Sequence, residues 1–160
     1  MNAATQAMVQ PKRDWFRILV LTGQTFFGAW FVIHGLNHWV HFFPQPPGSD
    51  SLTSQLIRVM IDTGLFDLIK ACEVFSGLLM LMHRFVPLAI VTAVPAAVVI
   101  AYINFFLNKG WESFMTATVI MVILALMGIG YIRSFAPLFV AKTDEPKGIS
   151  AAELRALFDR

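Results

Sequence analysis

The chain has 160 residues, of which 57% are hydrophobic and only 14% are charged, and its mean hydropathy is +0.67. A soluble domain would carry about 25% charged residues, so this composition excludes an ordinary water-soluble protein. The single cysteine, Cys72, excludes an internal disulfide and a dithiol motif. The net charge of +2 gives no reason to expect a nucleic acid as partner.

Four apolar stretches predict membrane-spanning helices. Residues 18–49, 85–108 and 113–132 contain no Asp, Glu, Lys or Arg, and a fourth stretch, 65–82, is apolar except for Asp67, Lys70 and Glu73. Crossing a hydrocarbon core of about 30 Å takes about 20 helical residues. We therefore expect an all-α, integral membrane four-helix bundle within residues 14–140, with helices at about 14–42, 64–82, 85–107 and 112–136.

The remaining segments are short. Residues 1–13 form a polar tail, and residues 52–61 follow a proline-rich stretch with the apolar spacing of an amphipathic helix, which could act as a lid. Pro95 predicts a kink in the third span. In the tail 141–160, Ser150 and Glu153 form a capping box that starts a short amphipathic helix.

The basic residues predict how the bundle is oriented. Nine of them flank one end of the predicted spans, whereas only Arg58 and Lys109 flank the other. The nine are Lys12, Arg13, Arg17, Arg84, Arg133, Lys142, Lys147, Arg155 and Arg160. Because cytoplasmic segments are enriched in Lys and Arg, both termini of this multi-pass protein are expected in the cytoplasm.

Polar residues inside the predicted spans gather at one depth. In this topology they fall in the extracytoplasmic half of the first three helices, whereas the opposite half is almost wholly apolar. We expect them to line a pocket. Its predicted members are His34, Asn37, His38, Lys70, Glu73, Tyr102 and Asn104, with Phe31 placed to stack on a planar ligand.

Lys70 and Glu73 are the charges that most need a reason, because a charge at the middle of a membrane helix costs roughly 2.5–3.5 kcal/mol. In one interpretation they form a buried ion pair that only fixes packing. In the other, Glu73 carries a proton and Lys70 donates to a ligand carbonyl or anion.

Three histidines share one face of the first helix. At about 100° per residue, His34, His38 and His41 fall within a narrow sector. Their imidazoles could bind a zinc, copper or iron ion. Alternatively, they are interfacial residues in an aromatic belt beside Trp39.

Three segments of the chain carry a recognisable pattern: GLNHWVHFFPQPP (35–47), GLFDLIKACEVFSGLLMLMHRFVPLAIV (64–91) and VVIAYINFFLNKG (98–110). Together they resemble the DoxX-like family of small bacterial inner-membrane proteins. The resemblance covers about residues 14–139 and implies a four-helix bundle that is multi-pass in the bacterial inner membrane. It also implies, from some relatives, a link to quinone-dependent sulfur oxidation or to membrane complexes that handle oxidative and thiol stress. Asn37 and Glu73 match the family's asparagine and glutamate, and His38 stands where many relatives have lysine.

Three functions follow as hypotheses. In the first, the pocket binds a quinone or similar lipid-soluble redox molecule within an oxidoreductase system, with a redox partner, since the chain has no flavin or dinucleotide fingerprint. In the second, the chain is a non-catalytic accessory subunit of a larger membrane protein complex. The third, a proton or solute path, fits poorly with the apolar inner half. The residues leave open whether the chain is itself an enzyme.

Overall fold

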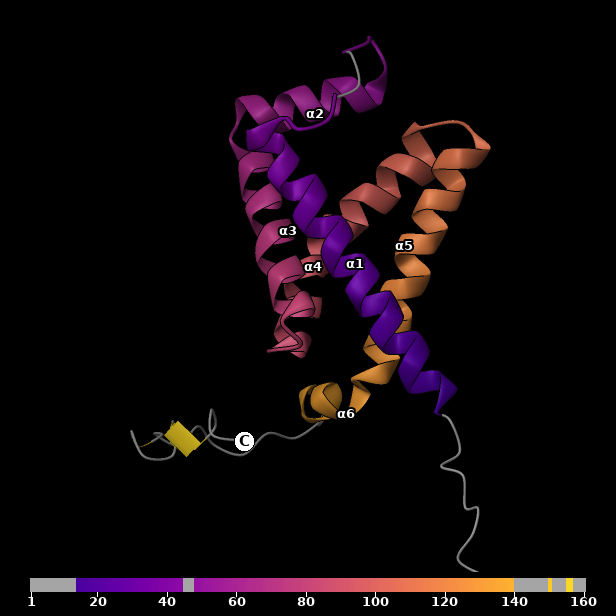
Figure 1. Ribbon diagram of the computed structural model, residues 1–160. Coiled ribbons are helices and arrows are strands. Elements are labelled where there is room, and N and C mark those ends of the chain that lie inside the picture. Colours follow the sequence, from indigo (N-terminus) through magenta and orange to yellow (C-terminus); the bar gives the residue numbers. More distant parts are fainter. Residues whose placement is uncertain (1–13, 45–47, 140–149, 151–154, 157–160) are drawn as a thin grey trace, which may run out of the picture.

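The computed structural model describes residues 14–44, 48–139, 150 and 155–156. That part of the chain is helical and contains no β-strand (Figure 1), which confirms the prediction of an all-α chain. The elements are α1 (Trp15–Val40), α2 (Leu52–Asp62), α3 (Leu65–Leu81), α4 (Val86–Tyr102), the π-helix η2 (Ile103–Leu107), α5 (Trp111–Gly130), α6 (Ile132–Phe135) and the 3-10 helix η3 (Ala136–Phe139).

Three of these elements are long and apolar enough to cross a membrane. They are α1, the continuous run of α4 and η2 (Val86–Leu107), and α5, with 26, 22 and 20 residues. At about 1.5 Å per residue each spans a hydrocarbon core of about 30 Å. α3 has 17 residues and carries three charged side chains. The structure thus indicates a membrane protein, with three such helices among the described residues.

The first end of α1 is capped by a side chain, and its last end is marked by a residue in the left-handed conformation. The carboxylate of Asp14 accepts a hydrogen bond from the backbone N–H of Arg17 at 3.1 Å and caps the first turn. At the other end His41 adopts the left-handed conformation (φ 55°, ψ 42°), and its N–H bonds the carbonyl of Asn37. α1 therefore ends at Val40, before the expected limit at residue 42.

The last predicted span is divided in two. α5 ends at Gly130, Tyr131 leaves the helical conformation (φ −104°, ψ 16°), and α6 follows. A β-carbon on Gly130 would lie 2.7 Å from a methyl of Val20, so the glycine allows α5 to approach α1 closely. Glycine also weakens a helix by roughly 0.5–1 kcal/mol relative to alanine, which favours a break here.

The third span is continuous but not uniform. α4 runs through Pro95, whose ring is exposed, to Tyr102, and then the backbone changes to the π register of η2. The sequence did not predict this change. The segment expected at 52–61 corresponds to α2, while Glu153 of the expected C-terminal capping box lies outside the described residues.

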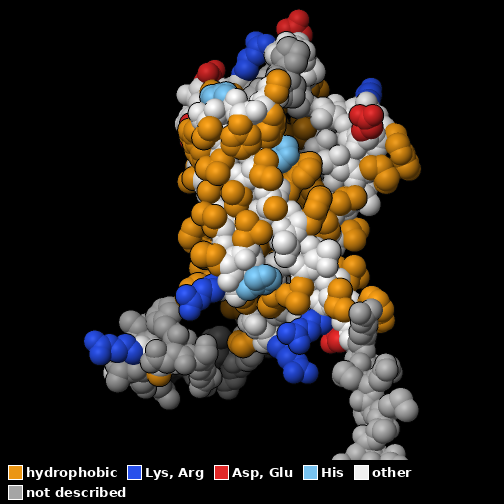
Figure 2. All heavy atoms as spheres, in the orientation of Figure 1, with side chains coloured by type: hydrophobic (Ala, Val, Ile, Leu, Met, Phe, Trp, Pro, Cys, Tyr) orange, Lys and Arg blue, Asp and Glu red, His pale blue; other side chains and the backbone are white. Residues whose placement is uncertain are grey.

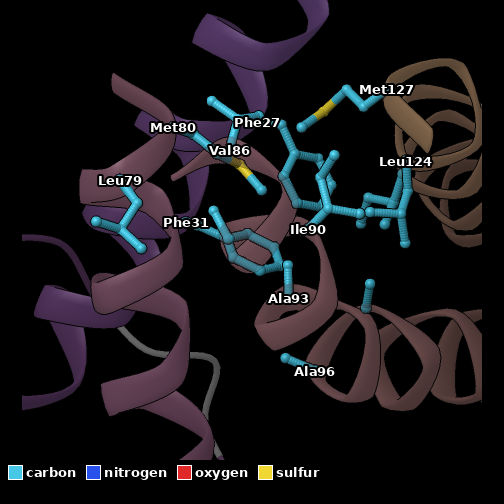
Figure 3. Packing of buried hydrophobic residues seen from close by; sticks show 13 residues of the cluster. Phe27, Phe31, Leu79, Met80, Val86, Ile90, Ala93, Ala96, Leu124 and Met127 are labelled. Carbon is cyan, nitrogen blue, oxygen red and sulfur yellow. The ribbon is translucent and has the colours of Figure 1, made fainter. Parts of the chain in front are cut away.

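α1, α3, α4 and α5 enclose one core. α1 packs against α3 and α5, and α4 packs against the same two helices from the other side. Figure 3 shows side chains from these helices meeting in the cluster. Its members are Phe27, Phe31, Leu79, Met80, Val86, Ala89, Ile90, Ala93, Ala96, Ala97, Ile120, Leu124 and Met127. The alanines of α4 allow its neighbours to approach closely.

Hydrophobic side chains also cover the outside. Figure 2 shows them as a broad band across the middle of the visible face, with mostly Lys and Arg below it and charged residues of both signs above it. α2 lies across the upper end of α1 and α3 (Figure 1), at the end where the predicted polar residues lie. An apolar belt between charged ends is what a bilayer requires of a protein that spans it.

Candidate functional site: an ion pair on the wall of an apolar cavity

Lys70 and Glu73 form an ion pair between neighbouring turns of α3. The ammonium Nζ of Lys70 donates to Oε1 of Glu73 at 3.0 Å and to Oε2 at 2.8 Å. Residues at i and i+3 face the same side of a helix, and here that side points inward, because Glu73 is only 1% exposed. Nζ also lies 5.1 Å from the ring centre of Phe66. The ammonium therefore has a carboxylate and an aromatic face as partners.

The pair borders a cavity of about 160 Å³ between α2, α3 and α4 with η2. Its polar side chains are Lys70, Glu73 and Asn104, and the rest of its wall is apolar. The lining residues are Ile57, Met60, Phe66, Ile69, Lys70, Glu73, Ala96, Val99, Ile100, Ile103 and Asn104. An apolar cavity with a few convergent polar groups is the usual form of a small-molecule site.

Asn104 reaches the cavity from the π-helix η2. Its side-chain Nδ2 donates to the carbonyl of Ile100 at 2.8 Å. The carbonyl therefore has a side-chain partner next to the point where the backbone leaves the α register at Ile103. π segments occur frequently at functional sites, and this one places a polar residue opposite Lys70 and Glu73.

His38 lies at the outer edge of this site rather than inside it. Its Nε2 is 2.9 Å from Oδ1 of Asp67, which also accepts a hydrogen bond from the indole of Trp39 at 3.2 Å. The imidazole meets the ring of Phe66 edge-on, with centres 5.0 Å apart. Phe66 thus contacts both His38 and Lys70.

The other two histidines of the predicted face have separate surroundings. His34 stacks on Trp30, with ring centres 4.2 Å apart, and meets Phe43 edge-on. His41 lies beyond the end of α1, where its Nδ1 is 3.1 Å from the carbonyl oxygen of Trp39. Among the described residues no three His, Cys, Asp or Glu side chains are placed to hold a metal ion. The geometry gives the predicted metal site no support.

Three further predicted ligand residues point elsewhere. Asn37 is fully buried, and its amide both accepts from the N–H of Phe43 and donates to the same residue's carbonyl, so it shapes the loop. Tyr102 is 51% exposed and packs on Phe106. Phe31 is fully buried in the core. Of the predicted pocket residues, the structure brings Lys70, Glu73 and Asn104 together around the cavity.

A second polar cluster lies at the opposite end and was not predicted. Gln24 of α1 is fully buried; its Nε2 donates to the carbonyl of Met80 at 2.7 Å and lies 3.0 Å from Nδ1 of His83. The hydroxyl of Tyr131 donates to Oε1 of Gln24 at 2.6 Å. The phenol of Tyr131 keeps its O–H at neutral pH, so it is the donor in this bond. A lone Gln in an apolar helix was the signal for this cluster, but it did not reveal the partners.

A wholly different cavity lies between α1 and α5. It measures about 260 Å³, and its wall is almost entirely apolar. The lining residues are Phe26, Phe27, Trp30, Met115, Thr116, Val119, Ile120 and Ile123. The hydroxyl of Thr116 is bonded to the carbonyl of Glu112 in its own helix. The wall therefore offers no charged group that could act on a ligand.

Comparisons with protein-family models, with curated proteins and with solved structures give no match to this chain. The resemblance to DoxX-like proteins therefore stays an expectation from sequence motifs. The chemistry of the site rests on the geometry around Lys70 and Glu73.

Proposed function

We propose that this chain is a DoxX-like protein of the bacterial inner membrane that binds a quinone, or a similar small lipid-soluble redox molecule, in the cavity beside Lys70 and Glu73. It would do so as part of a membrane oxidoreductase system. In this proposal α1, α3, α4 with η2, and α5 are the four spans of a bundle, and both termini are cytoplasmic.

The partners of the charges on α3 support its role as a fourth span. Lys70 and Glu73 neutralise each other, and Asp67, nearer the end of the helix, has His38 and Trp39 as hydrogen-bonding partners. Charged residues in membrane helices are tolerated when they face the bundle interior and are paired. α3 also contacts α1 at both of its ends, through the Trp39–Asp67 hydrogen bond and the close approach of Gly77 to Gly28.

The observation that carries the proposal is the buried ion pair at the polar end of an otherwise apolar cavity. A quinone head is a flat apolar ring with carbonyl acceptors. Phe66, Ile69 and Ile100 would contact the ring, and the ammonium of Lys70 is the donor within the cavity wall that suits a carbonyl.

Glu73 gives the site a way to couple a ligand to a proton. Lys70 already donates to both carboxylate oxygens, so a ligand carbonyl must compete with Glu73 for the ammonium. If Glu73 takes up a proton, its hold on Lys70 weakens, and the ammonium is released towards the ligand. Electrons would have to come from a partner protein, which is why we place the chain within a larger system.

Bound quinone is the direct test. The full chain is purified from a quinone-containing bacterial membrane in mild detergent, and the extracted quinone is quantified by liquid chromatography with mass spectrometry. We expect the purified wild-type chain to retain quinone. Lys70→Met should lower retention about tenfold or more, because a charge-assisted hydrogen bond contributes about 1.5–3 kcal/mol. Glu73→Gln should also change the amount of quinone retained.

Glu112→Gln is the matched control for Glu73→Gln. Glu112 is an exposed carboxylate in the first turn of α5 and does not line the cavity. It should leave quinone retention unchanged. Equal retention in the wild-type chain and both cavity variants, with each eluting as a folded species, would refute the proposal.

One observation favours a second candidate, the accessory subunit. The ion pair satisfies itself, since Lys70 bonds both oxygens of Glu73 and leaves no buried side-chain polar atom without a partner among the described residues. A pair of this kind can serve packing alone. This candidate predicts that the chain leaves the membrane with a larger complex and carries no quinone when purified by itself.

A further inference from the structure

α2 forms the outer wall of the ion-pair cavity. Ile57 and Met60 of this helix line the cavity together with Lys70 and Glu73, and Met60 is the residue of α2 that is buried, at 5% exposure. In Figure 1 the helix lies across the end of α1 and α3 instead of running beside them. A molecule that enters from the outer end must therefore pass α2.

α2 and the residues before it form a unit that is bonded within itself. Ser51 caps the helix by accepting from the N–H of Ser54, the guanidinium of Arg58 donates to the carbonyl of Ser49, and Gln55 donates to the carbonyl of Asp50. These bonds do not depend on the other helices. The unit can therefore move without losing them.

One side-chain hydrogen bond joins this unit to the rest of the described chain. Oγ1 of Thr53 donates to Oδ1 of Asn108, at the end of η2, at 2.7 Å. Apart from it, α2 is held against α3 and η2 by apolar contacts such as those of Met60. A neutral hydrogen bond contributes little net free energy, so a single such bond is a latch that opens easily.

The joint between α2 and α3 is suited to rotation. It consists of Thr63 and Gly64, and Gly64 adopts a positive φ of +74° with no atom within 4 Å of the place where a β-carbon would be. Glycine populates both signs of φ, so the backbone can change direction here without a side-chain clash. Joints of a few residues at the end of an element are where hinges occur.

We propose that α2 is a lid on the Lys70–Glu73 cavity, which turns about Gly64 and is held closed by the Thr53–Asn108 hydrogen bond. Opening exposes the cavity to the outer surface and lets a ligand in or out. The meaning of the lid for quinone exchange rests on the proposed function, but the motion itself does not. It applies to whatever small molecule the cavity takes.

The test measures access to the cavity without any quinone. In a Cys72→Ala background, Ile100→Cys places a thiol on the cavity wall, and the protein in nanodiscs is treated with a small charged maleimide. Mass spectrometry of the peptide gives the labelling rate. Adding Thr53→Val, which removes the latch, should raise that rate about two- to tenfold, whereas Thr118→Val should not, because Thr118 bonds only the carbonyl of Phe114 in its own helix.

A second variant holds the lid closed. Thr53→Cys and Asn108→Cys place one thiol on each side of the latch, and a short thiol cross-linker joins the two before labelling. The labelling rate of the cavity thiol should then fall below that of the same protein without cross-linker. Equal rates in the latch variant, the Thr118→Val control and the cross-linked protein would overturn the lid. Loss of the lid would leave quinone retention to be judged by Lys70→Met and Glu73→Gln, so the two proposals fail separately.

Discussion

Gly77 of α3 faces Gly28 of α1 at backbone contact. A β-carbon on Gly77 would lie 2.7 Å from the carbonyl oxygen of Gly28 and 3.0 Å from the backbone nitrogen of Val32, whereas one on Gly28 would lie 3.0 Å from the carbonyl oxygen of Gly77. Small residues at such crossings allow membrane helices to pack closely. This contact sets the spacing of the two helices below the ion pair.

Gly77→Ala should therefore destabilise the protein. The new methyl meets backbone atoms, which cannot rotate away, so α1 and α3 must separate at an overpacking cost of about 1–3 kcal/mol. Unfolding in mixed detergent micelles, followed by circular dichroism, measures the loss. Gly128→Ala is the control, because nothing lies within 4 Å of its β-carbon position; it should be neutral or slightly stabilising. Equal stabilities of the two variants would contradict the close contact.

The long helices were predictable because their signal is local. An uninterrupted apolar run has few alternatives to a membrane helix, and the segments found as α1, α4 with η2, and α5 have such runs. The end of α1 was not predictable, because the chain turns at His41 and the loop after it is held by the side chain of Asn37 bonding the backbone of Phe43. The π register of η2 likewise has no local sequence signal.

The candidate site was predictable only in part, because only its local features have a signal in the sequence. Helical spacing placed Lys70 beside Glu73, and depth placed Asn104 at their level, as the structure has them. Depth alone does not give the direction of a side chain around its helix or its partner in a loop. The structure shows His34 stacked on Trp30 and Tyr102 facing outward, and depth predicted neither direction.

Removing one member of the ion pair should cost more than removing both. Lys70→Met leaves the carboxylate of Glu73, 1% exposed, without its partner. Breaking a buried pair in this way costs roughly 3–5 kcal/mol, whereas replacing both charges with apolar side chains is often neutral. The double variant Lys70→Met/Glu73→Met should recover most of the stability lost by Lys70→Met, as measured in the same micelle assay. If the double variant is as unstable as the single one, the ion pair stabilises the protein by more than it costs to bury its two charges.

Tyr131→Phe should weaken the cluster at the other end of the bundle. It removes the donor to Oε1 of Gln24, which is fully buried. An unsatisfied buried acceptor costs about 1–3 kcal/mol. Tyr102→Phe makes the same chemical change on a side chain that is 51% exposed and should have little effect. If both variants unfold at the detergent fraction of the wild type, the bond to Gln24 is not stabilising.

The hydrogen bonds around Gln24 determine which ring nitrogen of neutral His83 carries the proton. The carbonyl of Met80 can only accept, so the Gln24 amide atom 2.7 Å from it is Nε2. The same Nε2 lies 3.0 Å from Nδ1 of His83, which must then accept as well. Neutral His83 should therefore carry its proton on Nε2, pointing away from Gln24.

His41 should show the opposite tautomer in the same sample. Its Nδ1 is 3.1 Å from the carbonyl oxygen of Trp39, so that nitrogen must donate and the proton lies on Nδ1. Nitrogen-15 shifts of histidine-labelled protein, recorded where the imidazoles are neutral, distinguish the two forms. Gln24→Leu removes the donor to His83 and should mix its tautomers while leaving His41 unchanged. A proton on Nδ1 of His83 in the wild-type protein would mean that the Gln24 amide is turned the other way and that the cluster is bonded differently.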